Sequence, residues 1–229
     1  MSGLLTEEGT AYHLNIKMFN KLQHTITGWP GGKPNADDSN RPERANIPKK
    51  RVIIFSPHPD DDVISMGGTF DRLVEQGHDV HIAYQTSGNI AVSDEEALKF
   101  AEVSKEINSD SKKVSKIIDF LKNKKRNDAI DSLEVRHLKR TIRKRESLAA
   151  TRYLGLSDKN VHFLNLPFYE TGTIKKGNLS NKDIHLMTSL IDTIKPHQIY
   201  AAGDLADPHR THKLCLDALF PVFNSLAVT

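Results

Sequence analysis

The feature that most constrains the fold is the run Val52-Ile53-Ile54-Phe55, four apolar residues without a polar interruption. Such a run is typical of a strand that is buried on both faces of a parallel sheet. Helical spacing follows over residues 63–75 and ends at Gly77, and a second strand-like stretch covers residues 80–84. A strand, a helix and a second strand in this order form a βαβ unit, whose crossover is right-handed.

The same alternation continues through the rest of the chain. We expect further strands over residues 161–164 and 198–201. We expect further helices over residues 95–107, 114–121, 142–154 and 180–194, and a last helix that begins at Asp207 and Pro208. Alternating strands and helices predict an α/β fold, a Rossmann-like three-layer αβα sandwich with a mostly parallel sheet.

The first 47 residues differ in character from the rest. Residues 11–22 have helical spacing, and a stretch rich in glycine, proline and polar residues runs from Thr27 to Pro48, as is typical of a linker. We therefore expect an N-terminal helix and linker over residues 1–47 and one α/β domain over residues 48–229.

Composition narrows the possible partners. Residues 99–145 carry 15 Lys and Arg against 7 Asp and Glu. Since no nucleic-acid-binding motif accompanies this basic stretch, we interpret it as a solvated helical insertion and expect no nucleic-acid partner. No apolar run approaches the roughly 18 residues of a membrane span, so none is expected. The single Cys215 excludes an internal disulfide, and a cytoplasmic location is the expectation.

Two polar clusters fall where ligands bind in open α/β sheets, beyond the carboxyl ends of strands. His58-Pro59-Asp60-Asp61-Asp62 follows residues 52–55, and His209-Arg210-Thr211-His212 follows residues 198–201. Each cluster has a simpler explanation when taken alone: an acidic run can cap a helix, and two histidines three apart can lie on a polar helix face.

Together, the two clusters favour a metal site. Three adjacent aspartates repel one another, and a divalent cation relieves that repulsion. A catalytic zinc takes three ligands of the His, Asp or Glu type and leaves a fourth position for water. His58, Asp61 and His212 can supply such a set, and one carboxylate is then left over for a general base.

The run of residues 54–62 resembles the signature of the PIG-L/LmbE family of zinc-dependent N-acetylglucosamine de-N-acetylases. That signature is a strand followed by His-Pro-Asp-Asp-Glu, and Asp62 here stands in place of the glutamate. The second motif of the family, His-x-x-His after a late strand, is matched by residues 209–212. A third similarity is Arg143-Lys144-Arg145-Glu146, and the resemblance covers about residues 51–220.

The resemblance implies a role for each matching residue. It makes Asp60 the general base that deprotonates the attacking water, and His209 the group that stabilises the oxyanion or protonates the leaving amine. Arg143 matches a position that contacts substrate, with an exposed helix arginine as the alternative. The implied ligands of zinc, or of another divalent metal, are His58, Asp61 and His212. The implied reaction removes the acetyl group from an N-acetylglucosamine-type sugar or conjugate.

A second resemblance concerns the N-terminal part. Residues 5–13 and 27–34 resemble the junction in bacterial two-domain proteins that place a glucosamine-6-phosphate deaminase-like domain before a PIG-L-like domain. This implies that the chain is the C-terminal part of such a protein. Only 17 residues follow His212, so we expect the domain to be truncated at its C-terminus.

Two alternatives to the deacetylase function follow. The short C-terminus and Asp62 favour a catalytically silent metal- or sugar-binding module of a larger amino-sugar protein. Deamination of a sugar phosphate lacks a matching set of catalytic side chains in this chain.

Overall fold

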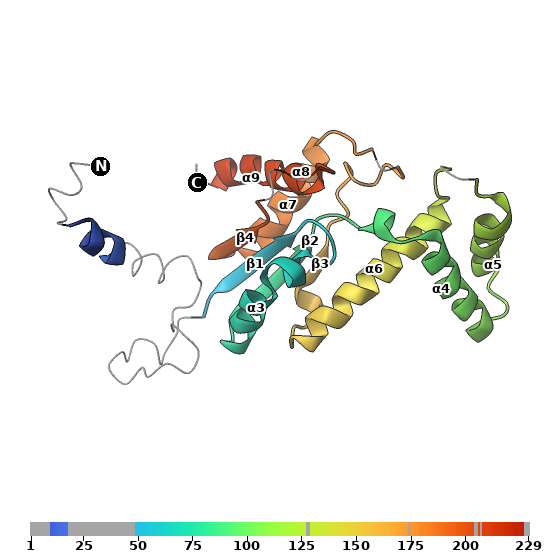
Figure 1. Cartoon of the computed structure of the whole chain (residues 1–229), viewed down its shortest axis with the longest axis horizontal. Coiled ribbons are helices and arrows are strands. Elements are labelled where there is room, and N and C mark those ends of the chain that lie inside the picture. The colour runs from blue at the N-terminus through green and yellow to red at the C-terminus, as the bar shows by residue number, and fades with distance from the viewer. Residues whose placement is uncertain are drawn as a thin grey trace.

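The computed structural model describes residues 10–17, 49–126, 129–173, 175–203, 206 and 208–226. Within these ranges four strands form one sheet in the order β3-β2-β1-β4, and all pairs are parallel (Figure 1). The strands are β1 (Arg51–Ser56), β2 (Asp79–Tyr84), β3 (Val161–Phe163) and β4 (Gln198–Ala201). The expected parallel sheet is therefore confirmed.

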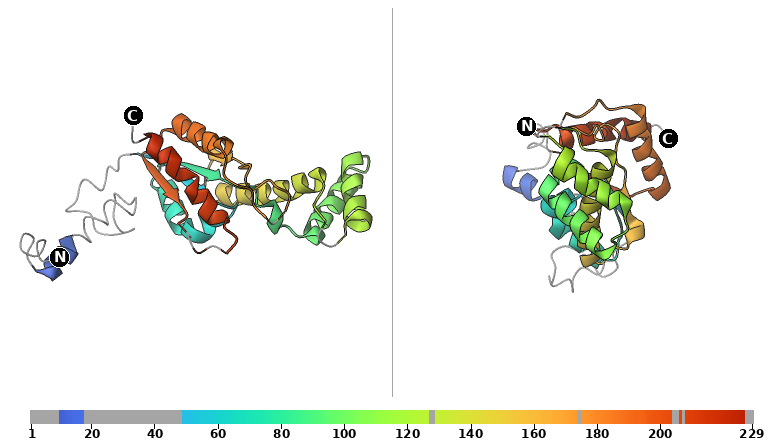
Figure 2. Two further views of the ribbon diagram at one scale, coloured as in Figure 1. Left: turned by 90° about the horizontal axis from the view of Figure 1, so that it is seen from above. Right: turned by 90° about the vertical axis from the view of Figure 1, so that its right-hand side faces the viewer.

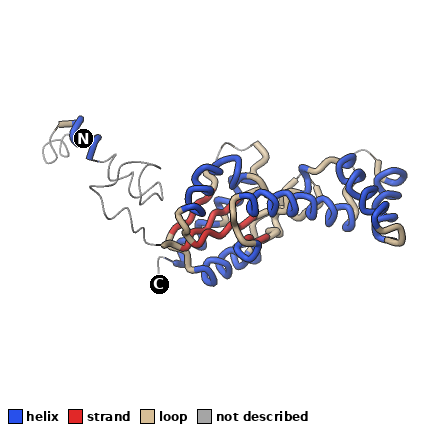
Figure 3. Tube along the Cα trace, turned by 90° about the horizontal axis from the view of Figure 1, so that it is seen from below, coloured by secondary structure: helices blue, strands red, loops and turns tan. Residues whose placement is uncertain are grey.

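Helices cover both faces of the sheet, as the tube in Figure 3 shows with the strands between layers of helix. One layer contains α3 (Asp61–Glu75) and the C-terminal half of α6 (Leu133–Tyr153). The other layer contains α7 (Asn181–Ile194), α8 (Thr211–Asp217) and α9 (Leu219–Leu226). The remaining elements are η2 (Asn89–Ala91), α4 (Asp94–Ile107), α5 (Lys112–Asp119), η3 (Phe120–Lys124) and η4 (Asp158–Asn160).

The central strand β1 explains why the apolar run has no polar interruption. Val52 and Ile54 point to one side, where they join a core cluster that contains Phe70 of α3. Ile53 and Phe55 point to the other side and join a cluster with residues of α7, α8 and α9. Because successive side chains of a strand alternate between faces, a strand covered on both faces must be apolar at every position. The three-layer αβα arrangement is confirmed.

The basic region forms a helical arm, which we define as α4, α5, η3 and the N-terminal half of α6. Figure 2 shows this arm extending away from the sheet. Four ion pairs link elements of the arm. The Nζ atoms of Lys125 and Lys139 each lie within 2.6–2.9 Å of carboxylate oxygens of both Asp94 and Asp131. Lys139 is buried, and paired buried charges are costly to separate. The expected helical insertion is therefore present, and it is anchored by this charge network.

Two helix boundaries differ from the sequence-based expectation. Helix α6 begins at Leu133 rather than at residue 142, with the Ser132 side chain accepting a hydrogen bond from the Val135 amide. Its first turns are mostly charged because only a narrow apolar stripe faces the arm. Helix α8 begins at Thr211, after Arg210 in a left-handed conformation, and not at Pro208.

Some expectations fall on parts of the chain that the structure does not describe. Residues 11–17 are helical, whereas the rest of the predicted helix over 11–22, the linker and Asp207 lie outside the described residues. The domain division at residue 48 stays a prediction. Among the described helices, none combines the length and apolarity needed to cross a bilayer.

We expect Phe70→Ala to lower the free energy of unfolding by about 3–5 kcal/mol, because Phe70 is fully buried between α3 and β1 and its removal leaves a cavity. The measurement is urea unfolding followed by circular dichroism. The matched control is Tyr153→Ala at the end of α6, where the side chain is 91% exposed, and its effect should stay within about 0.5 kcal/mol. Equal effects of the two substitutions would contradict the assigned core.

Candidate metal centre

Three side chains from two distant segments meet at the carboxyl end of β1. The three donor atoms are His58 Nδ1, Asp61 Oδ2 and His212 Nε2, and each pair of them is 3.2 Å apart. His58 lies in the loop after β1, Asp61 begins α3 and His212 lies in the first turn of α8. In the part of the chain that the structure describes, this is the group whose geometry suits a bound metal ion. The predicted ligand set is therefore brought together.

The donor triangle fits a divalent cation. Bonds of about 2.0–2.1 Å in a tetrahedral site place neighbouring nitrogen or oxygen donors about 3.3 Å apart, close to the 3.2 Å found here. Burial acts to raise the pKa of the Asp61 carboxyl, but hydrogen bonds from the His58 side chain and backbone, with the charges of His58 and His212, outweigh it. The pKa of Asp61 is therefore below its ordinary value, and the carboxylate form that binds metals is favoured.

Asp62 has a structural position below this centre. Its buried carboxylate accepts a hydrogen bond of 2.9 Å from the Tyr84 hydroxyl, and its amide donates to Ser56 Oγ over 3.0 Å. Ser56 Oγ in turn donates to the His58 carbonyl over 2.6 Å. Burial raises the pKa of Asp62 against the effect of the Tyr84 hydrogen bond. Asp62, the residue that departs from the family signature, thus stabilises the turn and does not line the cavity above it.

Asp60 lies at the edge of the centre and pairs with Arg143. Arg143 Nη2 donates to Asp60 Oδ2 over 2.6 Å, and Nη1 donates to Glu146 Oε2 over 2.9 Å. The Arg143 side chain is 18% exposed, so the alternative of an exposed helix arginine is wrong. Instead, α6 directs this guanidinium toward the carboxyl end of the sheet, where it holds Asp60.

A cavity of about 800 Å³ opens above these side chains, within the range of ligand pockets. His58, Asp60, Asp61 and Arg143 line it, and His209, in the turn before α8, lies on its rim as an exposed side chain. His212 completes the donor triangle below. We call this the candidate-site cavity.

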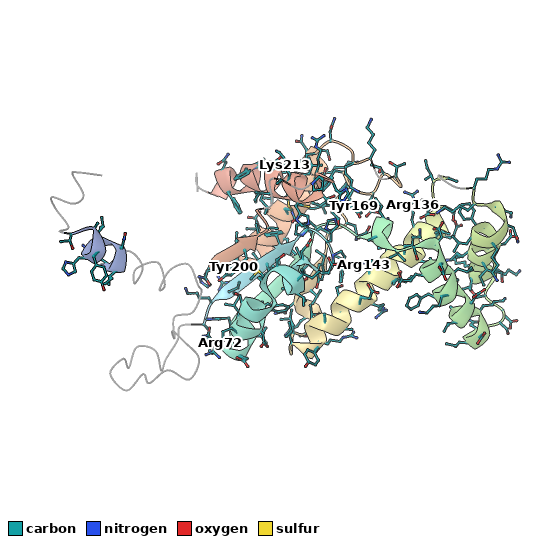
Figure 4. The ribbon with its side chains drawn as sticks, in the orientation of Figure 1. Arg72, Arg136, Arg143, Tyr169, Tyr200 and Lys213 are labelled. Atoms are coloured by element: carbon teal, nitrogen blue, oxygen red, sulfur yellow. The ribbon has the colours of Figure 1, made fainter. Side chains whose placement is uncertain are left out.

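Tyr169, which the sequence did not single out as a site residue, is buried in the wall of this cavity. Figure 4 labels this side chain. Its ring meets the His58 ring edge-on, with 6.0 Å between centroids, and Lys176 Nζ lies 4.2 Å from its ring centre. Burial, and then the charge of Glu170, raise the pKa of Tyr169 to about 12, so the hydroxyl stays protonated near neutral pH. Its position after the third strand was the signal that could have identified it.

Gly88 allows the loop after β2 to approach the site. It has a φ of 63°, and a Cβ atom there would lie 2.8 Å from Pro59 Cδ and 3.3 Å from Arg143 Nε. The loop of residues 86–89 therefore packs against the motif after β1 and against α6 at once. A side chain at this position would force one of them away.

The chain is therefore an α/β protein with a parallel sheet. A cluster of two histidines and one aspartate at the carboxyl ends of the strands forms a candidate metal centre. More specifically, the chain belongs to the PIG-L family, described as GlcNAc-PI de-N-acetylase, whose family model matches residues 53–223. The recognised motifs and the donor cluster both lie within this range, so the family resemblance is confirmed.

Individual relatives match different shares of the chain. A glucosamine-6-phosphate deaminase-like protein of Bacteroides thetaiotaomicron is 56% identical over 229 residues, which cover 96% of this chain and 34% of the relative. The chain thus spans about a third of the length of that relative. Diacetylchitobiose deacetylase of Thermococcus kodakarensis is 40% identical over 47 residues, 20% of this chain and 18% of that protein. A solved structure of N,N'-diacetylchitobiose deacetylase from Pyrococcus horikoshii matches with a TM-score of 0.45 and 19% identity, covering 93% of this chain and 63% of that one.

We expect Gly88→Ala to lower the free energy of unfolding by about 1–2 kcal/mol, because an L side chain is strained at positive φ and meets Pro59 and Arg143. The matched control is Gly68→Ala in α3, where nothing lies within 4 Å of the added Cβ atom. That control should raise stability by up to about 1 kcal/mol, since alanine favours a helix interior. Chemical denaturation of both variants measures the difference, and destabilisation by Gly68→Ala alone would refute the role of Gly88.

Proposed function

We propose that the chain is a zinc-dependent N-deacetylase that removes the acetyl group from an N-acetylglucosamine-type sugar or conjugate. The observation that carries this proposal is the donor triangle of His58, Asp61 and His212, with the Asp60–Arg143 pair beside it. Membership of the PIG-L family, and the partial identity with a diacetylchitobiose deacetylase, support the reaction class.

The metal ligands are His58, Asp61 and His212. A divalent cation bound there supplies a Lewis acid that polarises the amide carbonyl and makes water acidic enough to attack at neutral pH. Two imidazoles and one carboxylate are the donor types that zinc accepts in catalytic sites, although other divalent ions bind the same set.

Asp60 is the general base in this proposal. Asp60 lines the same cavity as His58 and Asp61, and a carboxylate there can accept a proton from the attacking water. The hydrogen bond from Arg143 fixes the orientation of the carboxylate, and the guanidinium also faces the cavity in which substrate binds. Arg143 therefore serves as a positioning residue for Asp60 and as a substrate contact.

The proton donors of this proposal also line the cavity. His209, on the rim, protonates the leaving amine as the carbon–nitrogen bond breaks. The Tyr169 hydroxyl keeps its proton at neutral pH and can donate a hydrogen bond to a substrate oxygen. Amide hydrolysis requires both an acid and a base, and these side chains supply them.

We expect Asp60→Asn to keep the bound metal and to lower the rate of acetate release at least 100-fold, the usual scale of general base catalysis. The matched control is Glu146→Gln, because Glu146 is the other carboxylate paired with Arg143 and does not line the cavity. The control should keep at least a third of the activity. Acetate release and metal content are measured on the same preparations, and an active Asp60→Asn variant would remove Asp60 from the base role.

Removal of the metal should abolish acetate release, and added zinc should restore it. Asp61→Ala and His212→Ala should each lower the zinc content of the purified protein at least tenfold, because each substitution removes one of three ligands. The control is His81→Ala, since His81 pairs with His162 across β2 and β3 and lies outside the donor triangle. Elemental analysis after dialysis gives the metal content. Full zinc content in Asp61→Ala would refute the assigned ligands.

The alternative, a catalytically silent metal- or sugar-binding module, is separated from the deacetylase by one screen. The zinc-loaded chain is incubated with a set of N-acetylhexosamine conjugates, and acetate is measured. Zinc-dependent release from any of them excludes the silent module, whereas stoichiometric zinc without release from any of them supports it. The replacement of glutamate by Asp62 was one reason for that alternative. The hydrogen bonds of Asp62 to Tyr84 and Ser56 argue against this reason.

A further inference from the structure

Helix α4 of the arm carries apolar side chains that the packing of the arm does not use. Phe100 is 42% exposed, Val103 is 51% exposed and Ile107 is 83% exposed. The buried residues of α4 are instead Ala97 and Ala101, which join the small apolar clusters of the arm. Among the described residues, none of the three exposed side chains belongs to a core cluster. Helix α4 therefore has a second apolar side, which the described part of the chain leaves open to solvent.

The three exposed side chains form one stripe along the helix. Phe100, Val103 and Ile107 are spaced by three and then four residues, the spacing of neighbours on one helix face. We call them the α4 stripe. Single exposed apolar side chains are common on protein surfaces, whereas contiguous ones mark interaction sites.

The α4 stripe is separate from the candidate metal centre. It lies on the arm, which extends away from the sheet in Figure 2. The described lining of the candidate-site cavity contains no residue of the stripe. A partner bound at the stripe is therefore not a substrate of that cavity, and the chemistry of the stripe has to identify the partner.

Two charged side chains flank the stripe on the same side. Lys99 and Glu106 are seven residues apart, which places them two turns apart, about 10 Å along the helix axis. Both are exposed, and neither forms an ion pair within the described part of the chain. By contrast, Glu102 of the same helix is paired with Lys122 over 2.6 Å. Lys99 and Glu106 thus have charges of opposite sign that are available to a partner.

This arrangement of charges is complementary to itself. If two copies of α4 pack antiparallel across a two-fold axis near Val103, Lys99 of each copy lies opposite Glu106 of the other. A parallel pair would place like charges together. In the antiparallel pair, Phe100 of each copy also lies near Ile107 of the other, so that the apolar stripes cover each other. A partner of uniform acidic or basic charge would match only one of the two flanking residues.

We propose that the α4 stripe is a self-association surface, through which two copies of this chain form an antiparallel, two-fold symmetric dimer. Each copy contributes one helix to the contact, which lies at the small end of protein interfaces. We therefore expect a dissociation constant of about 10–100 µM. The proposal is independent of the proposed deacetylase function, since the stripe and the candidate-site cavity share no described residue.

The first test is sedimentation velocity of the full chain from about 1 µM to about 500 µM, a range that brackets the affinity expected for a small interface. The wild-type protein should shift from monomer to dimer. Val103→Glu should raise the dissociation constant at least tenfold, because it places two carboxylates against each other at the two-fold axis. The matched control is Tyr153→Glu on α6, which adds the same charge at a side chain that is 91% exposed and outside the stripe. The control should associate as the wild type does, and circular dichroism checks the folding of both variants.

Charge reversal tests the antiparallel arrangement without changing the apolar stripe. Lys99→Glu and Glu106→Lys should each raise the dissociation constant about three- to tenfold, since each turns both attractive contacts into repulsive ones. An equimolar mixture of the two variants restores opposite charges at both contacts and should associate as the wild type does. The double substitution should also recover the wild-type affinity. The control is Lys182→Glu, an exposed residue of α7, which should have no effect.

Three results would overturn the proposal. A wild-type protein that stays monomeric to about 500 µM, far above the expected dissociation constant, would leave the stripe to a different protein or to another segment of the chain. A dimer that Val103→Glu weakens no more than Tyr153→Glu does would have its interface elsewhere. Single charge reversals that associate as the wild type does would exclude the antiparallel contact. None of these outcomes depends on whether the chain releases acetate.

Discussion

The hydrogen bonds around Asp62 hold the turn on which the rest of the site depends. The hydroxyl of Ser56, the last residue of β1, donates to the His58 carbonyl and accepts a hydrogen bond from the Asp62 amide. The Tyr84 hydroxyl of the neighbouring strand donates to the Asp62 carboxylate. These contacts fix the path of the chain between the sheet and α3. His58 and Asp61 are therefore presented on the upper side of the turn, where His212 reaches them from the other layer of helices. A carboxylate shorter than glutamate suits this position, because its partners are already within hydrogen-bond distance.

Helix α6 connects the site to the arm. Its C-terminal half packs on the sheet through Leu148, its middle contributes Arg143 to Asp60, and its N-terminal half joins the arm through Lys139. A single helix therefore sets the separation between Asp60 and the charge network of the arm. The arm packs through only small apolar clusters, and most of its remaining surface is polar and exposed to solvent.

The sequence predicted the elements whose pattern is local. The apolar run of β1, the capping box that opens α7 and the two histidine motifs could all be recognised from neighbouring residues. The start of α6 could not, because its first turns bury only a narrow stripe against the arm. The contact between Arg143 and Asp60 was also out of reach, since it depends on how α6 packs beside the loop after β1.

The three consecutive aspartates first favoured a metal because of their mutual repulsion, and the structure changes that argument. The three carboxylates occupy different surroundings: Arg143 neutralises Asp60, burial raises the pKa of Asp62, and Asp61 alone faces the imidazoles. The protein itself thus relieves most of the repulsion. What supports a metal is instead the convergence of two imidazole nitrogens on one carboxylate oxygen at equal distances of 3.2 Å. That arrangement requires residues from the loop after β1, from α3 and from α8, and helix capping by itself does not explain the position of His212.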